Sequence, residues 1–514
     1  MASVEYLLSQ YVRALIDGSA AVFVGAGLSV PGGFSSWKEL LRDVASQLRL
    51  DVDQEHDLLA VAQYCVNENA GRGQINELLL REFTRRARPT PNHDLLAKLP
   101  LQRIWTTNYD TLLEEALQRQ KKRFEKKVTS EDLTSTLPGR ATTVFKMHGD
   151  ISAPHRTILT RDDYENYERT HPLFIDLLRG DLASKTFLFL GFSFSDPNID
   201  YVLGRLRVLL GQNRRDHFYI TRCFTLADFK NHPGSEADKR AKFRYERHKQ
   251  QLRINDLKRY GIQTVLVDDY AGITLILEEI SRRYARKSIL ISGSATIFEP
   301  LTQSYVEDIC RMLGERLIAT GLRLLSGTGL GIGSAVVTGA MTEIYKEQTE
   351  IGDRLMLVHF PQDIPAAQRK LAYEQYRQEL VSKAGYTVFI CGNKVGADGS
   401  IQNAEGVQKE FELTQSFRHF PIPIGCSGHV AQDIWKKVNA DLAGFFPGYD
   451  VASFFQVLND KNAGPQGIVN AVMDIIRVTQ RPPTRPWSVL TDDPECLSVA
   501  AMKQQPETNS HGAP

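Results

Sequence analysis

The sequence contains no Cys-x-x-Cys pair. Its six cysteines are scattered over the 514 residues, at positions Cys65, Cys223, Cys310, Cys391, Cys426 and Cys496. This spacing excludes the simplest zinc-ribbon and thioredoxin-like interpretations. Because no disulfide framework is indicated, we expect a reducing, cytoplasmic setting.

Long apolar runs are absent as well, and no stretch approaches the length that a membrane-spanning helix needs. The first twenty residues carry Glu5, Arg13 and Asp17 without an uninterrupted apolar core, so they do not resemble a secretory signal. An excess charge of one sign is also missing, because 62 Lys and Arg stand against 61 Asp and Glu. Neither nucleic acid nor a membrane surface is therefore expected as a partner.

Three common catalytic signatures do not occur. The sequence has no G-x-x-x-x-G-K-[ST] loop, no H-E-x-x-H and no G-x-S-x-G, so P-loop NTPase, zincin and α/β-hydrolase activities have no local support. The twelve histidines show no metal-ligand spacing. We expect no metal and no resident cofactor.

The sequence does contain short β-branched or aromatic runs that alternate with longer helical stretches. This alternation is typical of βαβ units around a parallel sheet and predicts an α/β fold. A first series of expected strands comprises Ala20–Val24, Arg103–Thr107, Thr143–Met147, Thr186–Leu190, His217–Thr221 and Ile262–Val267. A second series comprises Ser288–Ser292, Leu322–Leu325, Leu355–Phe360, Thr387–Ile390 and Pro421–Gly425. We expect one domain over residues 1–283, a second over 287–480, and a disordered tail over 481–514.

The segment Asn231–Gln251 is rich in Lys and Arg, which suggests a nucleic-acid patch. Glu236, Asp238 and Glu246 interrupt the basic residues, however. A solvent-exposed helical face is the favoured interpretation.

The first expected strand runs into Gly25-Ala26-Gly27-Leu28-Ser29. Small residues where a strand turns into a helix let the backbone approach a pyrophosphate. The third glycine of G-x-G-x-x-G is replaced by Val30. A tight strand-to-helix turn without a ligand therefore explains this segment equally well.

Two further segments place polar residues directly after an apolar strand. They are Trp105-Thr106-Thr107-Asn108-Tyr109-Asp110 and Phe145-Lys146-Met147-His148-Gly149-Asp150. Open α/β sheets bind ligands at this end of their strands. Asn108 and His148 are therefore the candidate catalytic residues.

The glycine turn, Thr106–Asp110, His148-Gly149 and Gly191-Phe192-Ser193-Phe194-Ser195-Asp196 together resemble successive motifs of the sirtuin-like superfamily, over roughly Ala20 to Val267. They match best its bacterial branch, which degrades NAD. The resemblance implies that Asn108 and His148 are catalytic and that NAD, the substrate, contacts Gly25, Ala26, Gly27, Ser29, Asp110, Ser193 and Asp196. Deacylating sirtuins usually carry two CxxC zinc pairs, which this sequence lacks, so cleavage of NAD itself is favoured.

The second series has its own signature, Gly327-Thr328-Gly329-Leu330-Gly331-Ile332-Gly333, after a strand and before the helical run Ala335–Tyr345. Four alternating glycines indicate backbone packed closely against a phosphate-bearing ligand. Together with Ile289–Ser294, this segment resembles the SLOG family of nucleotide-sensing Rossmann-like domains.

A sirtuin-like domain followed by a SLOG domain resembles the effector family of Thoeris antiphage systems. The resemblance implies that the SLOG domain binds a cyclic ADP-ribose isomer, made by a partner TIR-domain protein, and thereby activates NAD hydrolysis that depletes the cell of NAD. It also implies a homo-oligomer, specifically a homotetramer. The helical segments Tyr6–Ile16 and Ser36–Leu48 suit either a core or a subunit interface.

The same resemblance implies an activator site at Ser294, Gly329, Arg377, Lys394 and Glu410. Two cations suit a ligand with two phosphates, and a carboxylate can accept hydrogen bonds from ribose hydroxyls or an adenine amine. Taken singly, each charged residue is also consistent with an ordinary surface charge.

A ligand-gated NAD hydrolase is the leading hypothesis. The first alternative is a non-catalytic sensor that binds NAD or ADP-ribose without turning it over. The presence of both Asn108 and His148 favours the enzyme, because a binding protein needs neither at a strand end. An NAD-dependent protein deacylase is the second alternative.

Overall fold

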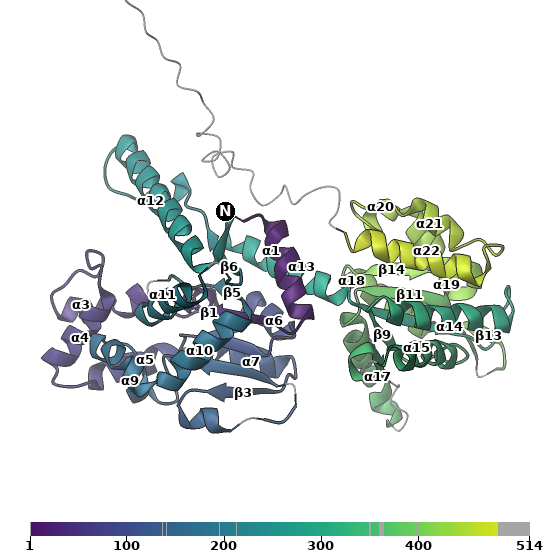
Figure 1. Cartoon of the computed structure of the whole chain (residues 1–514), viewed down its shortest axis with the longest axis horizontal. Helices are drawn as coiled ribbons and strands as arrows, with labels where there is room; N and C mark the ends of the chain where they lie inside the picture. Colours follow the sequence, from purple (N-terminus) through teal and green to yellow (C-terminus); the bar gives the residue numbers. More distant parts are fainter. Residues whose placement is uncertain are drawn as a thin grey trace, which may run out of the picture. The chain divides into compact units, whose positions relative to one another are not determined.

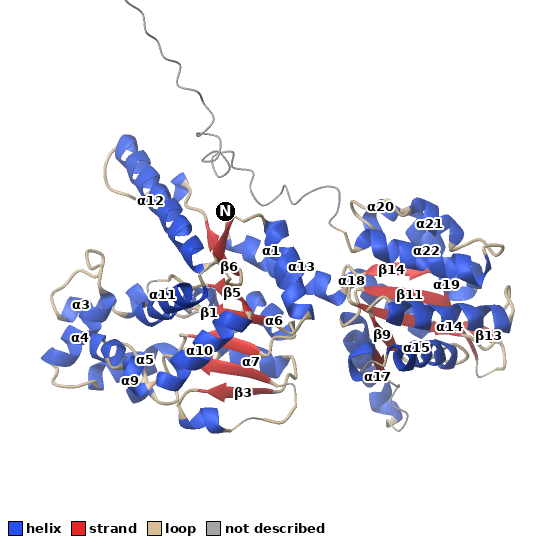
Figure 2. Ribbon diagram, in the orientation of Figure 1, coloured by secondary structure: helices blue, strands red, loops and turns tan. Residues whose placement is uncertain are grey.

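The computed structural model describes residues 2–135, 137–139, 141–194, 196–211, 213–348, 351–358, 364–396 and 398–481. The chain divides into two compact units, with the division between Ser281 and Arg282. Each unit is built on its own sheet with helices packed against it (Figures 1 and 2). The expected tail from residue 482 onward lies outside the described residues.

Seven described strands of the first unit form one parallel sheet in the order β3-β4-β2-β1-β5-β6-β7. Their bounds are β1 Ala20–Val24, β2 Arg103–Thr106, β3 Phe124–Lys127, β4 Thr142–Lys146, β5 Thr186–Leu190, β6 His217–Arg222 and β7 Ile262–Val267. The α/β fold class predicted from the alternating pattern is confirmed. Strand β3 was not predicted, because the sequence Phe-Glu-Lys-Lys is short and charged and pairs only with β4 at the sheet edge.

The core of this sheet is aromatic. Phe23 of β1 stacks on Phe189 of β5, and Trp105 of β2 stacks on Phe145 of β4 with ring centroids 4.3 Å apart. Helices α10 (Pro172–Ser184) and α11 (Pro197–Leu210) contribute their apolar residues to the same cluster. Because β1 and β5 are buried along their whole length, their sequences are continuous apolar runs.

The N-terminal helix α1 (Val4–Ile16) uses its apolar face for the core. Leu7, Leu8 and Leu15 are buried, and the Tyr11 hydroxyl donates a hydrogen bond to the carbonyl oxygen of Ala21 in β1 (2.9 Å). The other α-helices that begin in the described part of this unit are α2 Trp37–Leu40, α3 Arg42–Gln47, α4 Leu58–Glu68, α5 Gly73–Phe83, α6 Pro91–Lys98, α7 Leu112–Arg119, α8 Arg161–Glu165, α9 Tyr167–Thr170, α12 Glu236–Leu257 and α13 Tyr270–Ala285, the last of which continues past the division at Ser281.

Helices α2 to α5 are inserted between β1 and β2 and form a small cluster of their own. Leu41, Val61 and Leu79 are buried in it together with Tyr109, the residue that follows Asn108. This insertion therefore supports the loop at the end of β2. The Tyr109 hydroxyl donates a further hydrogen bond to the carbonyl oxygen of Ile158 (2.7 Å).

The basic segment forms most of α12, which Figure 1 shows extending away from the sheet. Its only fully buried side chains are Ile254 and Leu257. Lys239 pairs with Glu236, and Lys242 pairs with Glu246. The interpretation as a solvent-exposed helical face is confirmed.

The second unit contains a five-stranded parallel sheet of the order β10-β9-β8-β11-β14 and an antiparallel pair, β12 with β13, among its described residues. The strands are β8 Ser288–Ser294, β9 Arg323–Ser326, β10 Leu355–Leu357, β11 Tyr386–Cys391, β12 Asn393–Val395, β13 Ile401–Asn403 and β14 Phe420–Pro423. The helices are α14 Gln303–Ala319, α15 Gly333–Glu347, α16 Ile351–Arg354, α17 Ala366–Ser382, α18 Glu405–Ser416, α19 His429–Ala440, α20 Leu442–Phe445, α21 Ala452–Val457 and α22 Gly464–Thr479. None of the helices in the described part of the chain is long and apolar enough to cross a bilayer.

Candidate functional site

Asn108 and His148 follow two adjacent strands, β2 and β4, at the carboxyl edge of the first sheet. Thr106 of β2 is paired in register with Lys146 of β4, so each candidate residue lies two positions beyond a paired position. Adjacent strands are about 4.8 Å apart, which brings these two strand ends together. Strand β1, which ends at the glycine turn, separates β2 from β5 in the same sheet. The glycine turn and the segments that follow β2, β4 and β5 therefore all lie at the carboxyl edge of the sheet. The strand order changes direction between β1 and β5, and open α/β sheets bind ligands at such a point.

The glycines of the first turn pack against the turn after β5. The N–H of Gly27 donates a hydrogen bond to the carbonyl oxygen of Gly191 (2.9 Å). A Cβ at Gly25 would lie 2.5 Å from that same oxygen, and a Cβ at Gly191 would lie 2.3 Å from the nitrogen of Leu28. The close approach of two loops thus requires glycine here, independently of any ligand.

The expected helix does not begin after this turn. Two short 3-10 helices, η1 (Ala26–Leu28) and η2 (Val30–Gly32), follow β1 instead. Pro31 and the left-handed Gly33 interrupt the backbone, which prevents an α-helix from forming. Ala26 and Gly27 are nevertheless exposed at the surface of the turn.

Asn108 is buried and fixed by the glycine turn. Its Nδ2 donates hydrogen bonds to the carbonyl oxygen of Gly25 (3.2 Å) and to Oγ of Ser29 (3.0 Å). The Thr106 hydroxyl accepts from the N–H of Asn108 and donates to the carbonyl oxygen of Val24. The remaining polar atom, Oδ1 of Asn108, is buried without a hydrogen-bond partner among the described residues. Buried polar atoms of this kind are a minority in folded proteins, and a catalytic role is one of their explanations.

His148 is buried between two side chains. Its Nδ1 lies 3.4 Å from the Tyr164 hydroxyl, and its Nε2 lies 3.2 Å from Oδ2 of Asp196. The relative orientation of the imidazole and the Asp196 carboxylate does not satisfy hydrogen-bond geometry. Among the described residues, Nε2 has no hydrogen-bond partner. Burial lowers the pKa of His148, and the Asp196 carboxylate opposes that shift only in part. The imidazole is therefore neutral at pH 7 and able to accept a proton.

The three other residues that the resemblance assigns to NAD have different surroundings. Asp196 is the N-cap of α11, where its Oδ1 accepts hydrogen bonds from the backbone of residues 198 and 199, and it lies beside His148. Ser193 is exposed, and its carbonyl oxygen accepts from Arg253. Asp110 is buried, and its Oδ1 accepts from the N–H of Leu112 at the start of α7 (3.0 Å).

A buried lysine, which the sequence interpretation missed, joins the loops of the two candidate residues. Lys146 Nζ donates to the carbonyl oxygen of Tyr109 (3.1 Å) and contacts Glu114 (3.2 Å) and Asp150 (2.6 Å), with 1% of its side chain exposed. Burial opposes the charge on Lys146, but the neighbouring carboxylates raise its pKa, and Lys146 holds the pKa of Asp150 well below its usual value. A lone lysine inside the apolar run Val-Phe-Lys-Met was the available signal.

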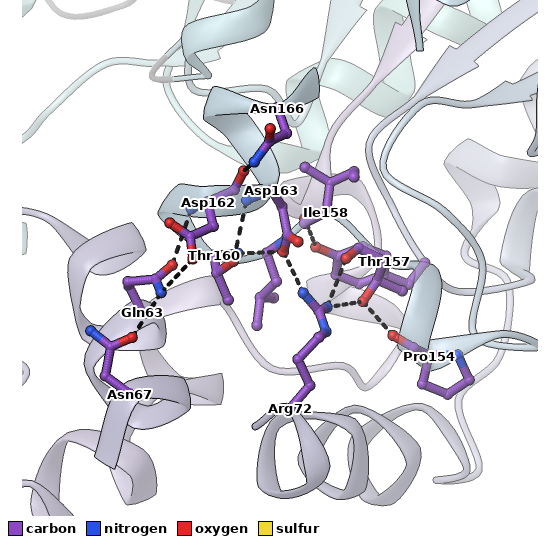
Figure 3. Close-up of polar contacts among 12 residues, drawn as sticks. Gln63, Asn67, Arg72, Pro154, Thr157, Ile158, Thr160, Asp162, Asp163 and Asn166 are labelled. Atoms are coloured by element: carbon purple, nitrogen blue, oxygen red, sulfur yellow. Dashed lines mark hydrogen bonds and ion pairs between the residues drawn. The ribbon is translucent and has the colours of Figure 1, made fainter. Parts of the chain in front are cut away.

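Tyr164 was not predicted as a site residue either. It lies on α8, whose position is fixed by side-chain contacts of Asp163. Figure 3 shows that Arg72 binds Asp163, the preceding residue of α8 (2.5 Å), and reaches the carbonyl oxygen of Thr157 (2.7 Å). Asp163 Oδ2 also accepts from the N–H groups of Leu159 and Thr160, which closes the N-terminus of α8. The same helix borders an open cavity of about 370 Å³ whose other wall is residues 128–131, directly after β3.

In the second unit, three of the relevant side chains converge at the end of β8. The Ser292 hydroxyl donates to Oε2 of Glu410 (2.6 Å), and Nε of Arg377 lies 3.8 Å from Oε1 of the same carboxylate. Burial raises the pKa of Glu410, while Ser292 and Arg377 oppose that shift. Ser292 itself was not among the predicted residues.

The other predicted activator residues lie at neighbouring strand ends. The Ser294 hydroxyl donates to the carbonyl oxygen of Asn393 (2.9 Å), and Lys394 follows on the exposed face of the β12–β13 hairpin. A Cβ at Gly329 would lie 1.9 Å from the carbonyl oxygen of Gly293. Here too, packing between loops accounts for the glycine.

Comparison with known proteins agrees with this architecture. The SIR2-like domain family matches residues 102–248, and the Sir2- and TIR-associating SLOG family matches residues 272–479. NAD(+) hydrolase ThsA of Acinetobacter baumannii is 41% identical over 92% of this chain and 98% of its own length. The chain belongs to the ThsA family. This confirms the resemblance drawn from the motifs.

Two further relatives are similar to this chain to different extents. NAD(+) hydrolase ThsA of Bacillus cereus is 37% identical over 92% of this chain and 98% of its own length. Defense-associated sirtuin 2 of Bacillus subtilis is 27% identical over 40% of this chain and 21% of its own length. The likeness to the two ThsA relatives spans both units.

Proposed function

We propose that this chain hydrolyses NAD+ to nicotinamide and ADP-ribose as part of antiphage defence. The observation that carries the proposal is the pair of buried polar atoms without hydrogen-bond partners, Oδ1 of Asn108 and Nε2 of His148, in the described part of the chain. They occur on adjacent strand ends at matching register. The names of the ThsA relatives support the same activity.

In the proposed reaction, the bond between the nicotinamide nitrogen and C1′ of the ribose breaks. Nicotinamide leaves with the bonding electron pair, and positive charge develops on the sugar. A water molecule adds to C1′, and its proton passes to Nε2 of His148. Oδ1 of Asn108 accepts a hydrogen bond from that water or from a ribose hydroxyl and so fixes its position. The products are nicotinamide, ADP-ribose and one proton.

The exposed turn at Ala26 and Gly27 is proposed to face the pyrophosphate, with Gly25 and Ser29 behind it. Ser29 reaches the substrate indirectly, because its hydroxyl already accepts a hydrogen bond from Asn108. Ser193 and Asp110 are retained as proposed NAD contacts on the family resemblance. Asp196 is better placed to act on His148 than on the adenosine.

Control by the second domain is part of the same proposal. A cyclic ADP-ribose isomer, made by a TIR-domain partner, is proposed to bind at Ser294, Gly329, Arg377, Lys394 and Glu410 and to activate hydrolysis. The matched family, whose members associate with Sir2 and TIR domains, supports this arrangement. We also propose that the two domains comprise residues 1–283 and 287–480. The protein is proposed to be a homotetramer and to be located in the cytoplasm.

Product analysis tests the activity. Purified protein is incubated with NAD+, with and without a cyclic ADP-ribose isomer, and nicotinamide and ADP-ribose are quantified by chromatography. Equal amounts of both products, released faster with the isomer, are expected. Binding of NAD+ without products would indicate the non-catalytic sensor. Products that form only with an acylated peptide would indicate a deacylase.

A further inference from the structure

His148 is held by side chains from two separate helices. The Tyr164 hydroxyl of α8 lies 3.4 Å from Nδ1 of His148 and donates to Oδ2 of Asp196 (3.3 Å). That carboxylate oxygen is also 3.2 Å from Nε2. The His148 and Asp196 side chains are 4% and 8% exposed, so solvent competes little with these contacts.

We propose that Tyr164 and Asp196 are positioning residues that fix the His148 ring with its proton on Nδ1, leaving the lone pair of Nε2 to accept the proton of the attacking water. The proposal rests on the proposed function for the role of His148 as base. It assigns to Asp196 a task at the imidazole in place of one at the adenosine.

The direction of the hydrogen bonds follows from the number of protons available. Burial raises the pKa of Tyr164 well above its usual value, and the Asp196 carboxylate adds to that shift, so the side chain remains a phenol. Its one proton is donated to Asp196. The phenol oxygen is then able to accept the N–H of His148 Nδ1. A neutral imidazole with its proton on Nδ1 carries a lone pair on Nε2.

Asp196 also faces the nitrogen that takes up the proton. When Nε2 becomes protonated, the imidazolium is buried, and a carboxylate 3.2 Å away stabilises it. The remaining ionisable groups around the ring are Asp163 of α8, Tyr167 of α9 with its ring centroid at 6.2 Å, and His171 beyond Tyr167. Asp163 forms an ion pair with Arg72, which offsets its negative charge. Asp196 is therefore the principal source of negative charge at the imidazole.

Asp196 allows a substitution that separates this role from folding. Its Oδ1 caps α11, and asparagine is as good an N-cap as aspartate. Asp196→Asn therefore keeps the helix cap and removes the charge beside His148. Tyr164→Phe keeps the ring that packs edge-on against His148 and removes only the hydroxyl. Tyr167→Phe is the control, because its hydroxyl donates to the carbonyl oxygen of Met147 and not to the imidazole.

The experiment uses full-length protein with ¹⁵N-labelled histidine, in which His148 is assigned by its loss in His148→Gln. In the parent, ring nitrogen shifts should report the proton on Nδ1. Tyr164→Phe should move the proton toward Nε2 and lower kcat by about tenfold or more, a part of the roughly 10²–10⁴-fold that a positioned base contributes. Asp196→Asn should move the acidic limb of the kcat profile to lower pH, because no carboxylate then opposes burial. Tyr167→Phe should leave the His148 shifts unchanged.

The possible failures are distinguishable. If both Tyr164→Phe and Asp196→Asn are folded and leave the His148 shifts and the acidic limb as in the parent, the positioning role is overturned. If the parent releases no nicotinamide, the proposed function is overturned, whatever the shifts show. If Tyr164→Phe does not fold, Asp196→Asn alone decides the question, by the same two measurements.

Discussion

Gly27 and Gly191 lie in backbone contact, with the N–H of Gly27 bonded to the carbonyl oxygen of Gly191 and the two Cα positions too close for side chains. This contact joins the turns after β1 and β5. A bulky residue at Gly27 would therefore disrupt the fold whether or not a pyrophosphate binds there. Loss of NAD binding in such a variant is not evidence for a phosphate contact.

The first prediction concerns the stability of this contact. Gly191→Ala should lower the free energy of unfolding by more than about 2 kcal/mol, because it adds a clash to the roughly 1–2 kcal/mol cost of left-handed backbone. Gly18→Ala is the control, since Gly18 also has left-handed φ (+67°) but no atom within 4 Å of the added Cβ. Urea unfolding measures both. Equal losses in the two variants would show that the loop contact contributes nothing.

The second prediction concerns the buried Lys146. Lys146→Met should destabilise the protein by about 3–5 kcal/mol, since it removes the buried ammonium that Asp150 and Glu114 share and leaves the Asp150 carboxylate to the partly exposed Lys126. Lys126 contacts the same carboxylate oxygen but is one-third exposed, so Lys126→Met should cost about 1 kcal/mol or less. Chemical unfolding tests the difference. A Lys146 variant as stable as the Lys126 variant would refute the proposed brace between the two loops.

The third prediction concerns stability against acid. Burial lowers the pKa of His217 to about 4, from an ordinary value near 6.5. Between these values the unfolded chain binds the proton and the folded chain does not, so stability falls as the pH drops from 6.5 to 4. The loss is about 3 kcal/mol, from roughly 2.5 pH units at 1.36 kcal/mol each. His217→Asn should make the pH dependence of the free energy of unfolding shallower by that amount.

The fourth prediction concerns the activator. Arg377→Ala should abolish activation by the cyclic nucleotide, because it removes a cation beside Glu410 at the end of β8. The NAD site should remain competent, as shown by an unchanged basal rate. Arg369→Ala, on an exposed part of the same helix, is the control and should be activated normally. Full activation of the Arg377 variant would place the activator elsewhere.

The strand ends of the first unit could be predicted from sequence because buried parallel strands are apolar runs that end abruptly in polar residues. That pattern was sufficient to place Asn108 and His148 at two strand ends of one sheet, whereas the pairing of these two strands is seen only in the structure. The glycine turns were harder to interpret, because a glycine that accommodates a ligand and one that accommodates another loop have the same signature. Tyr164 could not be predicted, since its contact with His148 depends on how α8 packs against the sheet.

The central claim is that Asn108 and His148 catalyse NAD+ cleavage, and turnover in their variants tests it most directly. Nicotinamide release is measured by chromatography for the parent, Asn108→Ala and His148→Ala, with the cyclic nucleotide present and folding checked by circular dichroism. Each variant should lose at least about a hundredfold in rate, the scale expected for a positioned acid–base group, while remaining folded. Near-parental turnover in both folded variants would contradict the account.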